Sequence, residues 1–490
     1  MGRMVRMFLA ASALAGATMS ATSAFAQEVV TKQYDDGGVY EGTFKDGKQH
    51  GRGTYRLPNG YVYEGDWVDG EILGQGKATY PNGSIFEGQF KNSKPDGKGK
   101  IVYADGSSYE GDWAAGDITG EGVAHYANGT TYTGAFRKAL HHGKGVMETA
   151  EGYRYDGDWL DGVKEGTGKI TYPDGAVYEG QMLKGQRAGQ GKLTLADGLT
   201  YEGGWSDGQM SGQGKLIQAN GDIYEGTLLA GKRQGQGKVT YANGDVYEGG
   251  FVADKRAGKG TFRGKDGYLY EGDWLDGQIS GTGRVTYADG SVYEGQFAHD
   301  LADGKGRVTH PDGSTFDGDW KAGVIEGQGK ATYANGLVYE GAFLKGKNHG
   351  KGRMTYPDGY SYDGDWKDGQ RDGQGVATYA DGTVYTGSFA KGQRDGQGEI
   401  TMADGFRYKG GWKAGAIDGQ GVATYANGDV YEGQFRNGRR QGQGTMRYAT
   451  GQTASGDWAE GVLTPAPGTA APVAPAPADG TTPPAEGAGN

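Results

Sequence analysis

The 490-residue sequence contains no cysteine, which excludes disulfide bonds and thiol chemistry. It also lacks a basic excess, because 50 Lys and Arg stand against 61 Asp and Glu. This balance argues against a nucleic-acid partner, since proteins of that class present a basic surface to the phosphates. After residue 26 no apolar run approaches the length that spans a membrane. Proline is scarce too, and 7 of the 13 prolines lie beyond residue 461.

Glycine, in contrast, is abundant, and its 100 residues follow a fixed period of 23 residues. Each copy begins at an aromatic residue, from Tyr40 to Tyr431, and a truncated nineteenth copy begins at Ala454. Counting this first residue as position 0, glycine fills positions 2, 11, 13 and 20 in every copy that reaches them. Such a period is typical of a repeat array whose units bury their surfaces against one another. The regular placement indicates a structural role for glycine and excludes a disordered, low-complexity chain.

Positions 18–20 of each copy carry the signal of a tight turn between two strands, as in Pro173-Asp174-Gly175. A two-residue type I′ turn and a three-residue loop closed by a bulge both fit this signal. Position 15 is apolar in every copy, and only the three-residue loop places it opposite the next aromatic position 0. We therefore predict a three-residue loop. The other connection is predicted to span about positions 5 to 12, which pairs position 4 with position 13.

The same register brings the glycine at position 11 beside position 4 of the next copy, where 17 of 19 copies have Trp or Phe. Glycine leaves room for such a ring. The predicted fold is therefore all-β, an elongated single-layer antiparallel meander of about 19 β-hairpin repeats of 23 residues. One face carries positions 0, 4, 15 and 17. The other carries Glu at position 1 and Lys or Arg at position 14, and these opposite charges would alternate across the strands.

The aromatic face is the candidate binding surface, because regularly spaced rings can stack on sugars, acyl chains or another protein. The alternative is that these rings are the only core of the array, and an uncovered apolar face would still mark an interface. The candidate binding residues are the nine tryptophans, all at position 4: Trp67, Trp113, Trp159, Trp205, Trp274, Trp320, Trp366, Trp412 and Trp458.

An irregularity interrupts the alternation of Trp with a smaller residue at position 4. Leu228 is followed by Phe251, where Trp is due, before the alternation resumes at Trp274. The structural unit is therefore a 46-residue pair of repeats in two phased blocks. Between about Met182 and Phe262 we predict a change of twist or a hinge with lower local stability, while neutral drift in a redundant array is the alternative.

The two ends of the chain differ from the array in composition. Residues 1–26 read as a secretory signal peptide, with Arg3 and Arg6 before an apolar stretch and an A-x-A cleavage site that ends at Ala26. Residues 27–461 form the predicted array. Residues 462–490 are rich in Pro and Ala and are predicted to form a disordered tail, either a spacer or a dispensable segment.

The recurring pattern YEGDW, DG, G-x-G and YADG resembles the MORN repeat (membrane occupation and recognition nexus), and the resemblance covers about Val29 to Trp458. It implies an elongated sheet of β-hairpins of the bacterial exported type that acts in scaffolding, tethering or membrane contact. We predict a non-enzymatic exported scaffold that mediates protein–protein interaction or tethering in the periplasm or cell envelope of a bacterium. Another protein or a second copy is the expected partner. The alternative is an array that binds a membrane surface, phospholipid or glycan.

No catalytic, cofactor or metal site is predicted. The glycine-rich segments do not fit the phosphate-binding loop, because no Gly-Lys pair is followed by Ser or Thr. Asp317 and Asp319 lack calcium-loop spacing and indicate a solvated face. His141 and His142 are adjacent, which permits weak metal binding, although a solvated turn is the simpler interpretation. The sequons that begin at Asn82 and Asn128 are interpreted as turns.

Overall fold

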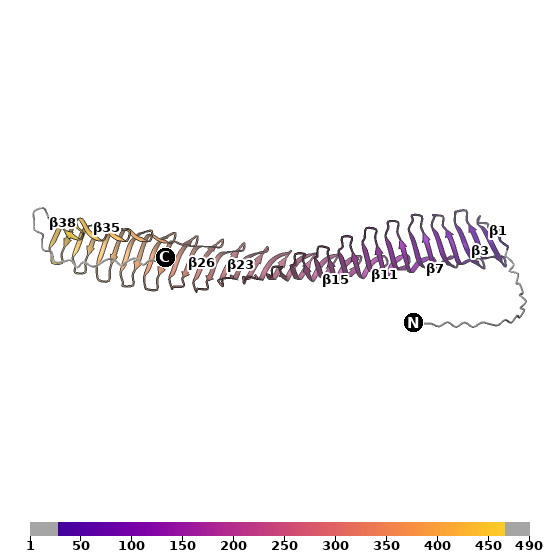
Figure 1. Ribbon diagram of the computed structural model, residues 1–490, viewed down its shortest axis with the longest axis horizontal. Coiled ribbons are helices and arrows are strands. Elements are labelled where there is room, and N and C mark those ends of the chain that lie inside the picture. Colours follow the sequence, from indigo (N-terminus) through magenta and orange to yellow (C-terminus); the bar gives the residue numbers. More distant parts are fainter. Residues whose placement is uncertain (1–27, 466–490) are drawn as a thin grey trace, which may run out of the picture. The chain divides into compact units, whose positions relative to one another are not determined.

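The computed structural model describes residues 28–465, and all the regular elements in that range are β-strands. The chain divides into two compact units. The first contains residues 28–197 and Trp205–Gln209, and the second contains Gly198–Gly204 and residues 210–465. Within each unit, strands pair antiparallel with the strands before and after them in sequence (Figure 1). The predicted antiparallel meander of hairpins is confirmed.

Two strand lengths alternate, because each repeat supplies a seven-residue strand and then a nine-residue strand. The strands of the first unit are β1 (Val30–Gln33), β2 (Val39–Lys45), β3 (Lys48–Arg56), β4 (Val62–Val68), β5 (Glu71–Thr79), β6 (Ile85–Lys91), β7 (Lys94–Val102), β8 (Ser108–Ala114), β9 (Asp117–His125), β10 (Thr131–Arg137), β11 (Leu140–Glu148), β12 (Arg154–Leu160), β13 (Val163–Thr171), β14 (Val177–Leu183) and β15 (Gln186–Thr194).

Two strands, β16 (Thr200–Ser206) and β17 (Gln209–Ile217), contain residues of both units. The strands of the second unit are β18 (Ile223–Leu229), β19 (Lys232–Thr240), β20 (Val246–Val252), β21 (Lys255–Arg263), β22 (Leu269–Leu275), β23 (Gln278–Thr286), β24 (Val292–Ala298), β25 (Leu301–Thr309), β26 (Thr315–Lys321), β27 (Val324–Thr332), β28 (Val338–Leu344), β29 (Lys347–Thr355), β30 (Ser361–Lys367), β31 (Gln370–Thr378), β32 (Val384–Ala390), β33 (Gln393–Thr401), β34 (Arg407–Lys413), β35 (Ala416–Thr424), β36 (Val430–Arg436), β37 (Arg439–Arg447), β38 (Thr453–Ala459) and β39 (Val462–Leu463).

The connection between consecutive repeats is the predicted three-residue loop. In the loop between β23 and β24, Tyr287 donates its backbone N–H to the Ser291 carbonyl at 2.8 Å, which encloses positions 18–20. Gly290 at position 20 has a φ of 86°, a conformation that glycine adopts without steric cost. Val285 at position 15 then lies opposite Tyr293 at position 0 of the next repeat.

The connection inside each repeat is shorter than predicted, and the predicted pairing of position 4 with position 13 is wrong. Asp276 and Gly277, at positions 6 and 7, have φ values of 52° and 90° and form a two-residue turn with both residues at positive φ, as in type I′. Trp274 at position 4 therefore pairs with Ile279 at position 9. The residue opposite Gly283 at position 13 is Gly272 at position 2.

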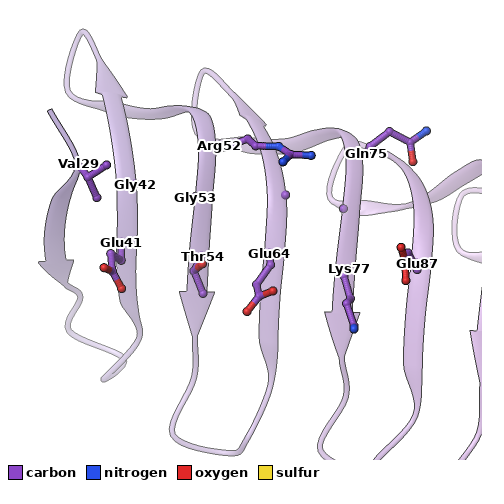
Figure 2. A pocket seen from close by; sticks show the side chains of 12 residues that line it. Val29, Glu41, Gly42, Arg52, Gly53, Thr54, Glu64, Gln75, Lys77 and Glu87 are labelled. Carbon is purple, nitrogen blue, oxygen red and sulfur yellow. The ribbon is translucent and has the colours of Figure 1, made fainter. Parts of the chain in front are cut away.

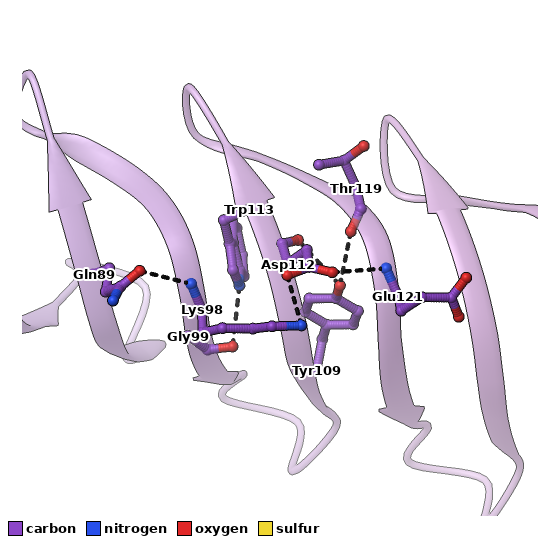
Figure 3. A network of polar contacts seen from close by, with 8 residues as sticks. All are labelled: Gln89, Lys98, Gly99, Tyr109, Asp112, Trp113, Thr119 and Glu121. Carbon is purple, nitrogen blue, oxygen red and sulfur yellow. Dashed lines mark hydrogen bonds and ion pairs between the residues drawn. The ribbon is translucent and has the colours of Figure 1, made fainter.

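A β-bulge reconciles the tight turn with the longer second strand. On the first strand only position 3 lies between positions 2 and 4. Their partners on the second strand are positions 13 and 9, and three positions, 10–12, lie between these. The bulge diverts the N–H group at position 12 from the ladder, and the side chain at position 3 accepts it instead. In this repeat Thr282 N–H donates to Asp273 Oδ2 at 2.9 Å. Figure 3 shows the same bond between Glu121 and Asp112.

The predicted placement of position 11 beside position 4 of the next repeat is confirmed, for example by Gly281 opposite Phe297.

Within the predicted hinge interval, the register from residue 212 to residue 263 repeats that of the flanking copies. The predicted change of twist or hinge stays a prediction. Residues 1–26 and most of the tail lie outside the described residues, and β39 begins just after the predicted array end at residue 461.

Candidate interaction surfaces

The index tyrosine at position 0 forms the floor of the aromatic face. Tyr270 is fully buried, and its ring lies along its own hairpin over Gly272 and Gly283. A Cβ added to Gly283 would lie 2.6 Å from the Tyr270 Cε2 atom, so only glycine fits beneath the ring. The hydroxyl donates to the Asp273 carbonyl at 2.7 Å. The glycines at positions 2 and 13 are therefore required by the aromatic ring at position 0 that covers them.

The aromatic residue at position 4 links neighbouring repeats. The Trp274 ring centre lies 5.2 Å from that of Tyr247 in the preceding repeat and 5.3 Å from that of Tyr270 in its own, both edge-to-face. Its indole N–H donates to the Gly260 carbonyl at 3.3 Å. Such pairs contribute about 0.5–1.5 kcal/mol each beyond the burial of area.

The nine tryptophans nominated as binding residues all occupy this linking position. Eight are buried, and Trp320 is partly buried. Their faces contact side chains of this same chain, so a ligand would have to displace those neighbours to reach them. Their role in binding stays a prediction, and the structure places them in the core.

Basic side chains at position 9 cover part of the ring layer, a feature that the sequence reading missed. The Arg256 guanidinium lies 4.1 Å from the Trp274 ring centre, and Arg440 lies 4.7 Å from that of Trp458. The Arg440 Nη2 atom also donates to the Gly461 carbonyl at 2.6 Å. A cation over an aromatic face contributes about 0.5–2 kcal/mol. The signal in the sequence was Arg or Lys recurring at one position between two aromatic positions.

His141 occupies position 9 in its copy and is part of the packing. Its ring stacks on Tyr132 with the centres 3.7 Å apart, and its Nε2 atom lies 2.7 Å from the Tyr126 hydroxyl. Burial lowers the pKa of His141 to about 4. Within residues 28–465 no group of three or more acidic or histidine side chains is arranged to hold a metal ion.

A tyrosine rim forms the more exposed part of the aromatic face. It consists of the tyrosines at position 17, next to the three-residue loops. In the first unit it includes Tyr80, Tyr103 and Tyr126, of which Tyr126 is 40% exposed. In the second unit it includes Tyr287, Tyr333, Tyr356 and Tyr379. The sequence placed position 17 on the aromatic face but did not single it out, because neighbouring loops set its exposure.

The opposite face is polar and carries the predicted opposing charges. Figure 2 shows a shallow depression of about 540 Å³ over the glycine row, with Glu41, Glu64 and Lys77 along one side and Arg52 and Gln75 along the other. In one copy the two charges are exchanged between the strands and the ion pair is kept. There the Lys409 ammonium at position 1 lies 3.5 Å from the Glu399 carboxylate at position 14. Exposed pairs of this kind contribute little free energy, about 0–1 kcal/mol each, and mainly fix the register.

A second polar row joins position 12 of one repeat to position 3 of the next. Lys98 Nζ lies 2.6 Å from Asp112 Oδ1, and this bond holds the pKa of the Asp112 carboxyl below its usual value (Figure 3). Asp319 is engaged in the same way by Lys305 at 2.5 Å, while Asp317 lies opposite Arg307. The acidic pair of residues 317 and 319 thus belongs to the solvated face. The Asn82 and Asn128 side chains accept backbone N–H groups two residues on, as expected of turns.

The buried tyrosines give the array a predicted alkaline limit. Burial raises the pKa of Tyr40, Tyr109, Tyr293 and Tyr431 to about 12 each. The unfolded chain ionises near pH 10, so it gains stability relative to the fold once the pH exceeds 10. We expect the free energy of unfolding to fall as the pH rises from about 10 to 12. Phenolate absorbance should appear over the same pH range in which the β-sheet circular dichroism signal is lost. Gradual tyrosine ionisation near pH 10 with the β-sheet intact would contradict this.

A repeat array of stacked β-hairpins with these two faces is a scaffold for interaction with proteins or membranes. The MORN repeat profile matches eighteen consecutive segments between residues 40 and 453, including 40–60, 270–292 and 431–453. The chain therefore belongs to the MORN repeat family. Within residues 28–465 no helix is long and apolar enough to cross a bilayer.

No curated protein matches the chain. Three of the solved structures that resemble it do so weakly. The TCP10 domain of Danio rerio CPAP, in complex with a peptide of STIL, is 14% identical with a TM-score of 0.18 and covers 60% of this chain and 100% of its own. The SAS-4 TCP domain of Drosophila melanogaster, in complex with a proline-rich motif of Ana2, is 14% identical with a TM-score of 0.18. The match covers 44% of this chain and 96% of that domain. Virginiamycin B lyase from Staphylococcus aureus is 12% identical with a TM-score of 0.09. The match covers 66% of this chain and 89% of the lyase chain.

Proposed function

We propose that the protein is a non-enzymatic scaffold, exported to the periplasm or cell envelope of a bacterium, that binds another protein through its tyrosine rim. The observation that carries the proposal is the exposure of the rim above a core that is already packed. The index tyrosines and most position-4 rings are buried, whereas Tyr103 and Tyr126 are 36% and 40% exposed. Over Tyr80, Tyr103 and Tyr126 the rim repeats at every second strand, so one partner can contact several rings.

The chemistry of the rim suits protein recognition. Tyrosine offers an apolar ring and a hydrogen-bonding hydroxyl at low conformational cost, and it is enriched at the centres of protein interfaces. These rings are already held in place by their neighbours, as the contact of Tyr126 with His141 shows. A partner therefore meets a largely preorganised surface.

Replacing Tyr80, Tyr103 and Tyr126 together by alanine should abolish partner binding while the array stays folded. Each ring at a protein interface is worth about 1–2 kcal/mol, so affinity should fall roughly tenfold or more per ring. A partner would be captured by the wild-type array from an envelope extract, identified, and its affinity measured by calorimetry.

The matched control replaces Glu64, Glu87 and Glu110 by alanine, which lie in the same repeats on the opposite face. This control should bind as the wild type does. Equal loss in both triple variants, or in neither, would contradict the rim as the binding surface.

Membrane binding is the second candidate, and the turn row at positions 5 and 8 favours it. In the second unit, Leu229, Val252 and Leu275 are 59%, 55% and 62% exposed, and Lys232 and Lys255 lie opposite the first two. Exposed apolar residues beside lysines suit an anionic bilayer surface. Flotation of the rim variant and the wild type with anionic vesicles separates the candidates, because the rim variant should lose only the protein partner.

Export makes a separate prediction. The basic residues, apolar stretch and A-x-A site over residues 1–26 support cleavage after Ala26. N-terminal sequencing of the protein from its producing cell should begin at Gln27, in the periplasmic or secreted fraction. A cytoplasmic chain that still begins at Met1 would contradict export.

A further inference from the structure

The two ends of the array each present a strand edge. In the described residues no strand pairs with the outer side of β1, and all four of its residues are exposed. At the other end, the outer side of β38 pairs with β39 at Trp458 and Ala459, and the Asp457 carbonyl accepts the Thr464 N–H at 2.8 Å. Within the described residues this leaves the backbone of Thr453–Gly456 open on that side. Open strand edges are templates for pairing with another chain.

The two ends supply complementary parts of one repeat. Residues 454–464 provide positions 0 to 10, and β39 covers positions 8 and 9. Residues 28–34 provide positions 11 to 17 of a copy whose first residue would be number 17, and β1 covers positions 13 to 16. The segment from Glu28 to Thr464 is 437 residues long, which is 19 × 23. Placed together, the ends complete a repeat with neither overlap nor gap.

The residues that depart from the repeat pattern at the two ends compensate each other in size. In every other copy an aromatic residue at position 0 covers a glycine at position 13, as Tyr270 covers Gly283. At the ends, position 0 is Ala454 and position 13 is Val30. A valine beneath a tyrosine ring would clash, whereas valine beneath alanine fits. In a complete repeat, valine at position 13 would clash with the ring, and alanine at position 0 above glycine would leave a cavity.

The backbone geometry also fits. Tyr34 N–H bonds to the Gly38 carbonyl, and Tyr448 N–H bonds to the Gln452 carbonyl, which sets the phase of each ladder. Because bonded pairs alternate along antiparallel strands, the backbone groups of Thr31 and Ser455 face the open edges. The repeat register pairs position 14 with position 1, so Thr31 would lie opposite Ser455.

Lys32 explains why this edge would not pair indiscriminately. It occupies position 15, which is apolar in every complete copy, and its ammonium lies 5.0 Å from the Tyr34 ring centre. A lysine that points into the core side of an edge strand opposes pairing with ordinary strands. Ala454 of the second chain would add no ring over the ammonium, so this pairing leaves the ammonium in contact with water.

We propose that β38 of one chain pairs antiparallel with β1 of a second chain, so that copies of the protein join head to tail and rebuild one repeat at each junction. The interface is heterologous, and chains can continue to add until the assembly closes or is capped. This proposal goes beyond the scaffold function and does not depend on the tyrosine rim.

Proline at the two facing residues tests the junction. Thr31→Pro and Ser455→Pro each remove one backbone N–H from an open edge, where proline is tolerated. Thr31→Ala and Ser455→Ala keep the N–H and are the matched controls. Sedimentation velocity of the full chain over a concentration series should show growing oligomers for the wild type and both alanine variants. Each proline variant should need a roughly tenfold or higher concentration to associate.

Mixing the two proline variants gives the decisive result. The Ser455→Pro chain keeps an intact β1 edge and the Thr31→Pro chain keeps an intact β38 edge, so an equimolar mixture should form dimers and nothing larger. Unchanged circular dichroism confirms that each variant is folded. A wild type that stays monomeric, proline variants that associate like the wild type, or a mixture without dimers would each overturn the proposal.

A size exchange provides an independent test. Ala454→Tyr places a ring above Val30 of the partner chain and should prevent association. Adding Val30→Gly to the same chain should restore it, because the junction then has the ring and glycine of an ordinary repeat. Failure of the double variant to recover association would overturn the assigned register.

Discussion

Gly283→Ala is expected to destabilise its repeat by about 2–3 kcal/mol, the range for overpacking a rigid core. The new Cβ would lie 2.6 Å from Tyr270 Cε2 and 2.7 Å from its hydroxyl oxygen. The ring cannot move aside, because its edge contacts Trp274 and its hydroxyl bonds to the Asp273 carbonyl. Amide hydrogen exchange across β22 and β23 should measure the loss locally, since a long array need not unfold in one step.

Tyr270→Ala is expected to cost about 3–5 kcal/mol, because it leaves a cavity where a large ring was packed. Combining Tyr270→Ala with Gly283→Ala should lower the free energy of unfolding by less than the sum of the two single effects. The ring atoms that clash with the new methyl group are absent from this double variant. Gly277→Ala is the matched control in the turn of the same hairpin. That glycine has a φ of 90° and no atom within 4 Å of an added Cβ, so only backbone strain of about 1–2 kcal/mol applies. Additive costs in the double variant would contradict the ring-on-glycine contact.

This contact also shows how far the sequence determines the fold. Face assignment depends only on whether a position is odd or even, and Glu271 and Tyr270 do face opposite sides. Register is a separate matter, because pairing position 4 with 9 or with 13 satisfies the same parity. The Asp276-Gly277 pair was the available signal for the shorter turn. The bulge that follows was hidden, since it depends on a bond between Thr282 and the Asp273 side chain.

The candidate surface was harder to predict than the fold. Rings at positions 0, 4 and 17 are equivalent in composition, and the sequence could not rank their exposure. The structure buries Tyr293 and Phe297 but leaves Tyr287 40% exposed, because Tyr287 closes a loop at the edge of the sheet. Arg256 contributes as well, because it covers Trp274 from the preceding strand, β21. Exposure therefore follows from neighbouring repeats and loop geometry.

The second large effect is expected where the ring ladder is interrupted, between Leu228 and Gly264 in the second unit. In the flanking copies of this unit the position-4 ring contacts two aromatic residues at position 0, as Phe297 contacts Tyr270 and Tyr293. Leu228 is buried at the same position but has no ring, so two edge-to-face pairs are lost. Gln218 and Gly264 also replace the position-17 tyrosine on either side.

Losing two ring pairs of about 0.5–1.5 kcal/mol each should lower the local opening free energy by about 1–3 kcal/mol. Backbone amides of β18–β21 should then exchange roughly 5- to 150-fold faster than those of β24–β27. Leu228→Phe should slow exchange in β18 and β19, because Phe251 and Phe297 show that this position accepts a phenylalanine. The control Leu229→Phe changes the exposed neighbour and should leave exchange unaltered. Equal protection across both sets of strands would show that the strand ladder, whose register is unbroken here, determines local stability without the rings.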